Sequence, residues 1–177
     1  MTIVTRTILA IPPLSGLAWG AAGSLDPSFG FGGKVVTGFG HNTRALDATL
    51  QSDGKLVVAM ALDNPPISTQ AFAVVRYLPN GALDVSFGKN GLAKVSFTNF
   101  INTPTFVAIQ PDGKIVVGGE AQSADGSVDE FAMARFNANG SLDTSFGSRG
   151  KVTTNFLTTH AGGFHEAANV VLFAAGW

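Results

Sequence analysis

Side chains suited to acid–base or metal chemistry are sparse in this sequence. Those that stand outside any repeated motif are Glu120, Glu130, His160, His165 and Glu166. The stretch from His165 begins like the HExxH pattern of a zinc-binding helix, yet Asn169 stands where the second His is required. The absence of cysteine excludes thiolate catalysis, disulfides and Cys-ligated metal centres. We therefore expect no catalytic residue, no metal site and no cofactor.

One acidic segment carries the oxygen ligands that calcium prefers. Asp125, Asp129 and Glu130 lie close together in the sequence. The matching segment that starts at Asp63 lacks these carboxylates, and no EF-type spacing is present. We favour a solvated turn over a calcium site. Phosphate-binding and nucleophile-elbow glycine motifs are also missing, because the Gly-rich stretch FGFGG belongs to a repeated turn.

The other notable acidic residues recur at nearly fixed intervals. Asp26, Asp84 and Asp143 each occupy the same place in an LDxSFG block. A catalytic site is built from a unique set of groups, so a residue present in every repeat indicates a structural role. We expect each carboxylate to cap backbone amides in an Asx turn. The phenylalanine three positions later is predicted to plug the core in each case, at Phe29, Phe87 and Phe146.

Two arginines recur in the same manner. Arg76 and Arg135 lie 59 residues apart, each two positions after an apolar residue of the same strand face. An inward-leaning guanidinium needs a partner. We predict that each pairs with the carboxylate of the turn that follows it, Arg76 with Asp84 and Arg135 with Asp143. The alternative is a solvated arginine on the sheet surface.

These recurrences belong to an internal repeat of 58 to 59 residues. The block GSLDPSFGFGGKV from Gly23 returns in similar form from Gly81 and Gly140. QSDGKLVV, from Gln51, returns as QPDGKIVV 59 residues later, and FAVVRYLPNG, from Phe72, returns as FAMARFNANG at the same interval. The phase is preserved, so each repeat is expected to be one structural unit.

Each repeat contains four short runs rich in β-branched or aromatic residues and bounded by turn residues. They cover 34–39, 45–51, 55–62 and 72–78, then 94–97, 105–110, 114–121 and 131–137. Asp-Gly pairs between the second and third runs are typical of tight hairpins and predict antiparallel neighbours. Apolar residues on both faces of the third run predict a sheet covered on both sides, as in a β-propeller blade. A solenoid stack is the competing architecture.

The three blocks together resemble the delta-60 repeat of bacterial proteins. The resemblance covers nearly all of residues 23–155 and rests on several multi-residue motifs at the right spacing. It implies β-propeller-like domains. It implies no activity, because that family offers no catalytic residues to carry over.

The chain divides into a segment at 1–22, repeats at 23–80 and 81–139, and a truncated third repeat at 140–177. The third repeat departs from the pattern after Leu172, where a QxDGK turn is due. About two and a half units cannot close a ring of the roughly four to eight blades usual in propellers. We therefore expect an all-β, incomplete array of antiparallel four-stranded blades, whose open sheet edges favour homo-oligomers.

Residues 1–22 resemble a secretory signal peptide, since Arg6 precedes an apolar stretch and small residues follow. The stretch is too short for a membrane-spanning helix, and Pro12 and Pro13 interrupt it, so no stable membrane insertion is expected. We expect export to the envelope or medium of a bacterium. An ordinary N-terminal strand in a cytoplasmic protein is the alternative. With 11 basic and 12 acidic residues, the chain has no basic tail for nucleic acid.

The sequence varies between repeats mainly in the connections expected at 98–104 and 122–130. Variable loops on a regular scaffold are where specificity resides. We therefore expect a non-catalytic structural or interaction scaffold that binds a protein or a glycan through these rim loops. The alternatives are a fragment of a hydrolase or lyase propeller and a non-functional remnant of a longer repeat protein.

Overall fold

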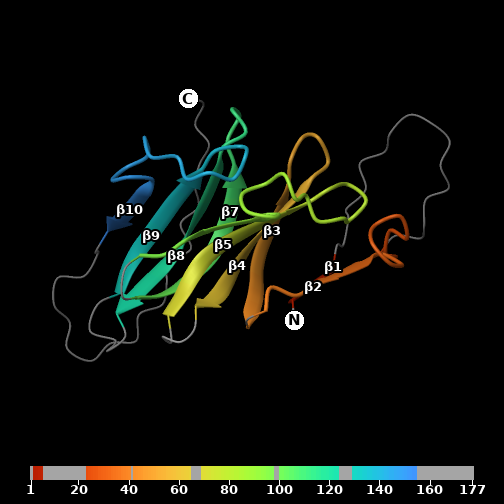
Figure 1. The fold of residues 1–177 in the computed structure, drawn as a ribbon, viewed down its shortest axis with the longest axis horizontal. Coiled ribbons are helices and arrows are strands. Elements are labelled where there is room, and N and C mark those ends of the chain that lie inside the picture. Colours follow the sequence, from red (N-terminus) through yellow and green to blue (C-terminus); the bar gives the residue numbers. More distant parts are fainter. Residues whose placement is uncertain are drawn as a thin grey trace.

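All regular secondary structure in the described residues is β-strand (Figure 1). The computed structural model describes residues 2–5, 23–40, 42–64, 69–97, 100–123 and 129–154. The strands are β1 (Thr2–Thr5), β2 (Lys34–Thr37), β3 (Thr43–Leu50), β4 (Leu56–Asn64), β5 (Thr69–Tyr77), β6 (Leu92–Val95), β7 (Phe100–Ile109), β8 (Ile115–Ser123), β9 (Asp129–Phe136) and β10 (Lys151–Thr154). None of the described residues forms a helix able to cross a membrane.

Two antiparallel four-stranded sheets make up most of the structure. The first sheet has the order β3-β4-β5-β6, and the second has the order β7-β8-β9-β10 when read from its other edge. A separate two-stranded pair joins β1 to β2. The prediction of an all-β fold built from antiparallel four-stranded blades is therefore confirmed, and both sheets are open at their edges.

The sheets are offset by one strand from the repeat in the sequence. We expected the run at 34–39 to share a sheet with the run at 45–51, but β2 pairs with β1, and β3 to β5 take β6 of the next repeat as their fourth strand. The reason lies in the turn after β5. Asp84 N–H donates to Arg76 O at 2.9 Å, and Arg76 N–H donates to Gly91 O at 3.2 Å, so the turn brings the chain straight back beside β5.

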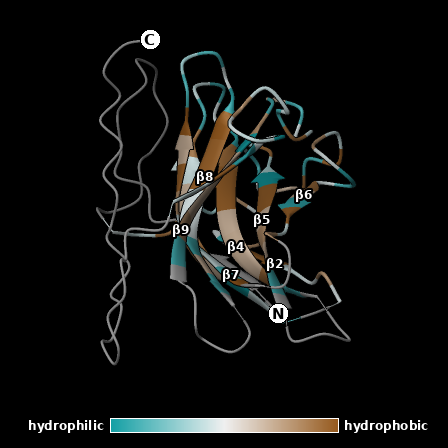
Figure 2. Ribbon diagram, turned by 90° about the vertical axis from the view of Figure 1, so that its left-hand side faces the viewer, coloured by the Kyte–Doolittle hydropathy of each residue, from teal (hydrophilic) through white to brown (hydrophobic). Residues whose placement is uncertain are grey.

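Apolar side chains cover both faces of the first sheet. Every residue of β4 from Leu56 to Leu62 is at most 6% exposed. One face packs against the second sheet through a cluster that includes Val57 and Phe72 on one side and Val117 and Phe136 on the other. The opposite face packs against Phe29, Val35 and Phe39, which precede β3 in the same repeat. Figure 2 shows the hydrophobic colouring along β4 and β8 that this double burial requires.

The second sheet extends further than its sequence predicts. β7 begins at Phe100 instead of residue 105, and it pairs with β8 up to Ser123, with a bulge between Pro104 and Phe106. A proline is tolerated here because β7 is an edge strand. The prediction that 98–104 and 122–130 are loops is therefore wrong for 100–104, 122–123 and 129–130, which are strand. Residues 98–99 and 124–128 lie outside the described residues.

The repeated turns gather at one end of the sheets. The Asp-Gly hairpins that follow β3 and β7 turn there, and so do the LDxSFG turns that follow β5 and β9 (Figure 1). The ends of β4, β6 and β8 that lead into the non-repeating connections lie at the opposite end, because consecutive strands run antiparallel. One end of the structure is thus nearly constant in sequence between repeats, and the other end varies.

Candidate functional site

The polar cluster at the repeated end is built around Arg76 in the first sheet. Arg76 Nε donates to Asp84 Oδ2 at 2.8 Å, and the two side chains are 8% and 7% exposed. The other carboxylate oxygen, Oδ1, accepts from the Ser86 amide at 3.2 Å and from its hydroxyl at 2.5 Å. The carboxylate therefore holds its own turn and the arginine of the strand before it.

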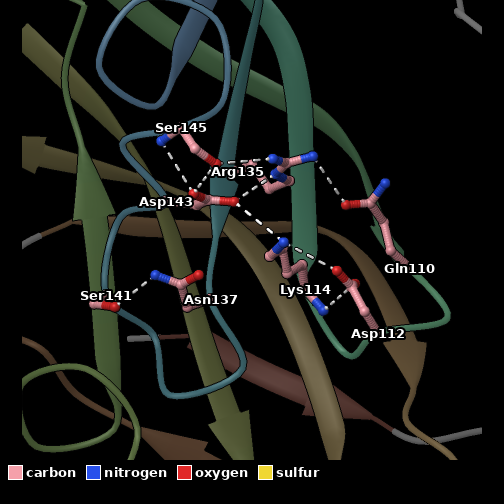
Figure 3. Close-up of polar contacts among 8 residues, drawn as sticks. All are labelled: Gln110, Asp112, Lys114, Arg135, Asn137, Ser141, Asp143 and Ser145. Atoms are coloured by element: carbon pink, nitrogen blue, oxygen red, sulfur yellow. Dashed lines mark hydrogen bonds and ion pairs between the residues drawn. The ribbon is translucent and has the colours of Figure 1, made fainter.

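The second sheet repeats this geometry (Figure 3). Arg135 Nε donates to Asp143 Oδ2 at 2.8 Å, and Asp143 Oδ1 accepts from the Ser145 amide and hydroxyl at 3.1 and 2.6 Å. Lys114 Nζ lies 3.6 Å from Asp143 Oδ2 and 3.0 Å from Asp112 Oδ2. The structure thus brings together both arginine–aspartate pairs that the sequence predicts.

Each guanidinium also lies over an aromatic ring. The Arg76 Cζ atom is 4.5 Å from the centre of the Phe87 ring, and Arg135 Cζ is 4.7 Å from that of Phe146. Phe29 and Phe87 are fully buried, as expected of core plugs, whereas Phe146 is half-buried. In the first turn, Asp26 Oδ1 accepts from the Ser28 amide at 2.9 Å and from its hydroxyl at 2.6 Å, the same turn-capping contacts as in the later repeats.

The first two LDxSFG turns each contact the Asn-Gly turn of the sheet that follows. Gly30 N–H donates to Asn80 O, and Gly88 N–H donates to Asn139 O, both at 2.8 Å. Arg76 Nη1 adds a bond to Ala138 O at 2.7 Å, from the first sheet to the turn that follows β9. These contacts were not predicted from the sequence. Their signal is the Asn-Gly pair that precedes the second and third LDxSFG blocks.

Close backbone approach at these contacts requires glycine. A Cβ atom on Gly140 would lie 2.5 Å from Gly88 N, and the backbone of Gly140 has a φ of +85°. A side chain there would collide with backbone atoms of the neighbouring repeat and would also strain its own residue. The Asn-Gly turn is thus shaped to lie directly on the LDxSFG turn of the preceding repeat.

The carboxylates of the cluster are held in their charged form. The hydrogen bond from the Ser145 hydroxyl contributes most to lowering the pKa of Asp143 to about 2, and the Ser145 amide and Arg135 add to this against the effect of burial. Burial raises the pKa of Asp84, but the Ser86 hydrogen bonds and the Arg76 charge together lower it below its ordinary value. Both groups are therefore ion-pair partners at neutral pH and are not poised as proton donors.

The candidates for acid–base chemistry do not converge. Glu120 pairs in register with Phe131, and Glu130 pairs with Ala121, so the two glutamates point to opposite faces of the second sheet. Among the described residues, no group of three or more His, Asp or Glu side chains is placed to hold a metal ion. His160, His165 and Glu166 lie outside the described residues, as do residues 125–128 of the acidic segment.

Two non-repeating polar residues connect the sheets and have no counterpart in the sequence pattern. Asp47 Oδ2 accepts from the Val107 amide at 2.8 Å, across from the first sheet to the second. Asn102, which is fully buried, donates from Nδ2 to Gln70 O. Each occurs in one repeat alone, so periodicity could not identify it.

Comparison with known proteins supports the repeat architecture. Residues 66–87 and 110–146 match the family described as a domain of unknown function (DUF5122) beta-propeller. Each matched stretch ends within an LDxSFG block and contains the arginine that pairs with its aspartate. No curated protein and no solved structure matches the chain.

Proposed function

We propose that this chain is a non-catalytic interaction scaffold that binds a protein or a glycan at the variable end of its sheets. The observation that carries the proposal is the division of the molecule into two ends. At the constant end, Arg76, Asp84, Arg135 and Asp143 are engaged in contacts within and between turns. The variable end is free to differ between repeats, and exposed loops on a regular scaffold are where recognition evolves.

The alternative of a hydrolase or lyase requires acid and base groups that converge on one substrate, and a pair of carboxyl groups is one such set. The glutamates of β8 and β9 lie on opposite faces, so this part of the second sheet supplies no such pair. The match to a beta-propeller family supports a repeat scaffold and carries no activity with it. A scaffold role therefore requires no converging acid–base groups, whereas a hydrolase or lyase does.

A loop-replacement experiment tests the proposal. Residues 98–99 and 124–128 are replaced by Gly and Ser at unchanged length, and binding to a glycan array and to a peptide array is compared with that of the native chain. Val85→Ser, at an exposed position of a repeated turn, is the matched control. We expect a bound glycan or peptide to be lost with the loops and retained in the control. Equal binding by all three proteins, or no binding on either array, would contradict the proposal.

We also propose that the chain is exported and loses its first residues. Arg6 and the apolar stretch after it support this. In the uncleaved chain, β1 at residues 2–5 pairs with β2, so cleavage would remove this pairing. Expression in a bacterial host followed by mass measurement of the product tests it. Recovery outside the cytoplasm with an N-terminus near Gly23 is expected, and an intact Met1 on protein confined to the cytoplasm would refute it.

A further inference from the structure

The third LDxSFG turn differs from the first two in what lies on it. The Gly30 and Gly88 amides each donate to the carbonyl of an Asn-Gly turn. Gly147 occupies the same place in the third turn, and no carbonyl within the described part of the chain accepts from its amide. The amide that binds the Asn-Gly turn of the next sheet is thus present in the third turn, but it has no such acceptor among the described residues.

The two arginines differ in the same way. Arg76 Nη1 donates to Ala138 O at 2.7 Å, whereas Arg135 Nη1 has a 3.5 Å contact with Gln110 Oε1 (Figure 3). Correspondingly, the Arg135 side chain is 19% exposed, and that of Arg76 is 8% exposed. Arg76 Nη1 is satisfied by Ala138 O. A backbone carbonyl in the equivalent position would give Arg135 Nη1 the same hydrogen bond.

The apolar face beside this turn is also less covered than its counterpart. Phe72 and Val74 are fully buried between the two sheets. Phe131 and Met133, at the equivalent positions 59 residues later, are half-buried. The second sheet thus repeats the surface on which the first sheet receives its neighbour.

We propose that the third LDxSFG turn of one chain, with Arg135 and Gly147, receives the Asn-Gly turn at 78–81 of a second copy of this chain. Gly147 N–H would donate to the partner's Asn80 O, and Arg135 Nη1 to the partner's Pro79 O, which corresponds to Ala138 O. The occupant follows from contacts that the chain makes within itself, the glycine-to-asparagine bond twice and the bond from arginine to the carbonyl of the turn once. The turn at 78–81 has the same backbone hydrogen bond as the turn at 137–140, from Gly81 N–H to Leu78 O and from Gly140 N–H to Asn137 O, both at 2.8 Å, so a second copy of the chain can supply it.

For a second copy to dock, its 78–81 turn must leave the first LDxSFG turn of its own chain and bind the third LDxSFG turn of the other chain. In each chain the 78–81 turn lies on its own first LDxSFG turn through Gly30. Residues 23–37 and 140–154 are identical at 11 of 15 positions, so one segment can replace the other on the first sheet. Arg76 and Arg135 each stand eight residues before the aspartate of the turn that follows. The residue eight positions before Asp26 is Ala18. The third LDxSFG turn of the other copy therefore brings Arg135 as a charged hydrogen-bond donor, and the first LDxSFG turn has no arginine at the equivalent position.

The proposed contact joins different surfaces of the two copies, so it is heterologous and assembles chains head to tail. Each copy supplies two complete four-stranded sheets. Propellers close with roughly four to eight blades, which corresponds to roughly two to four copies in a ring. A discrete mass in that range is the expected form.

Sedimentation velocity over a range of concentrations, together with amide hydrogen exchange, tests the proposal. We expect the native chain to form the discrete species and the Gly147 amide to gain protection as it forms, while the Gly30 amide loses Asn80 O as its acceptor and loses protection. Arg135→Gln should raise the concentration of half-assembly at least about tenfold, the equivalent of one charge-assisted hydrogen bond. Lys94→Gln, which removes an exposed charge on β6, is the matched control and should leave assembly unchanged.

A chain that stays monomeric, or one that associates while Gly147 exchanges as fast as in the dilute protein, would overturn the proposal. The exchange measurement needs no substitution, so it decides the matter even where Arg135→Gln fails to fold. Self-docking concerns the constant end, whereas the proposed binding function concerns the variable end. The loop-replaced protein should therefore assemble normally, and retention of ligand binding by that protein with intact assembly would count against the binding function alone.

Discussion

Arg76 and Arg135 form a natural pair for measuring what the contact between repeats contributes. Each donates to an aspartate at 2.8 Å and lies over a phenylalanine ring. Arg76 alone also bonds to Ala138 O in the next repeat. Removing one partner of a buried ion pair costs about 3–5 kcal/mol, because the remaining charge is left uncompensated. Arg76→Ala should therefore lower the free energy of unfolding by about that amount.

Arg135→Ala removes the same ion pair and ring contact without the bond to Ala138. A hydrogen bond from a charged group to a carbonyl contributes about 1.5–3 kcal/mol, so Arg135→Ala should cost less than Arg76→Ala by roughly this difference. Lys114, 3.6 Å from Asp143, reduces the cost further by compensating the carboxylate that remains.

Equilibrium denaturation in urea measures both costs on one scale. Arg44→Ala, an exposed change on β3, is the control and should stay within about 0.5 kcal/mol of the native chain. If Arg76→Ala behaved like this control, or if Arg135→Ala proved as costly as Arg76→Ala, the turn contact would not couple the repeats as described.

Three further perturbations address the same structure. The pKa of Asp143 is lowered from 3.8 to about 2, so the stabilising effect of its charge is full above the unfolded pKa and is lost as the pH falls through the folded pKa. The free energy of unfolding of Asp143→Asn should therefore depend less steeply on pH between roughly pH 4 and 2 than that of the native chain. An unchanged pH dependence would refute the assignment. Gly140→Ala should destabilise the chain far more than Gly23→Ala, because both glycines have φ near +85° but only Gly140 meets the backbone of Gly88; equal denaturation midpoints would contradict this. Burial raises the pKa of Tyr77, the sole tyrosine, although its hydrogen bond to Thr37 opposes the shift; its absorbance should titrate above pH 10 in the native protein and near 10 in guanidinium, and its stabilising effect should fade as the pH rises through the folded pKa.

The parts of the fold that periodicity describes could be predicted from the sequence. Repetition identified the four strands of each repeat, and the burial of both faces of β4 followed from its continuous apolar run. The Arg76–Asp84 pair was predictable because an inward-facing charge needs a partner and the next turn supplies one. Local pattern and tertiary contact agree at these positions.

Other features depend on contacts that a linear pattern does not encode. The sequence does not say whether β6 pairs backward with β5 or forward with β7; the hydrogen bonds between Arg76 and the turn after it decide this. The extension of β7 past Pro104 also depends on a partner strand long enough to pair with it. Asp47, whose carboxylate caps Val107 across the two sheets, occurs once and leaves no periodic signal.

The exchange rate of the Gly88 amide tests most directly the claim that the repeated turns join neighbouring sheets. Gly88 is exposed, so its amide would exchange rapidly unless the bond to Asn139 O, at 2.8 Å, protects it. Measured by NMR in dilute protein, the Gly88 amide should exchange only with global unfolding, while the equivalent Gly147 amide exchanges fast. Equally fast exchange of the two amides would show that successive turns are not docked, and would contradict the account.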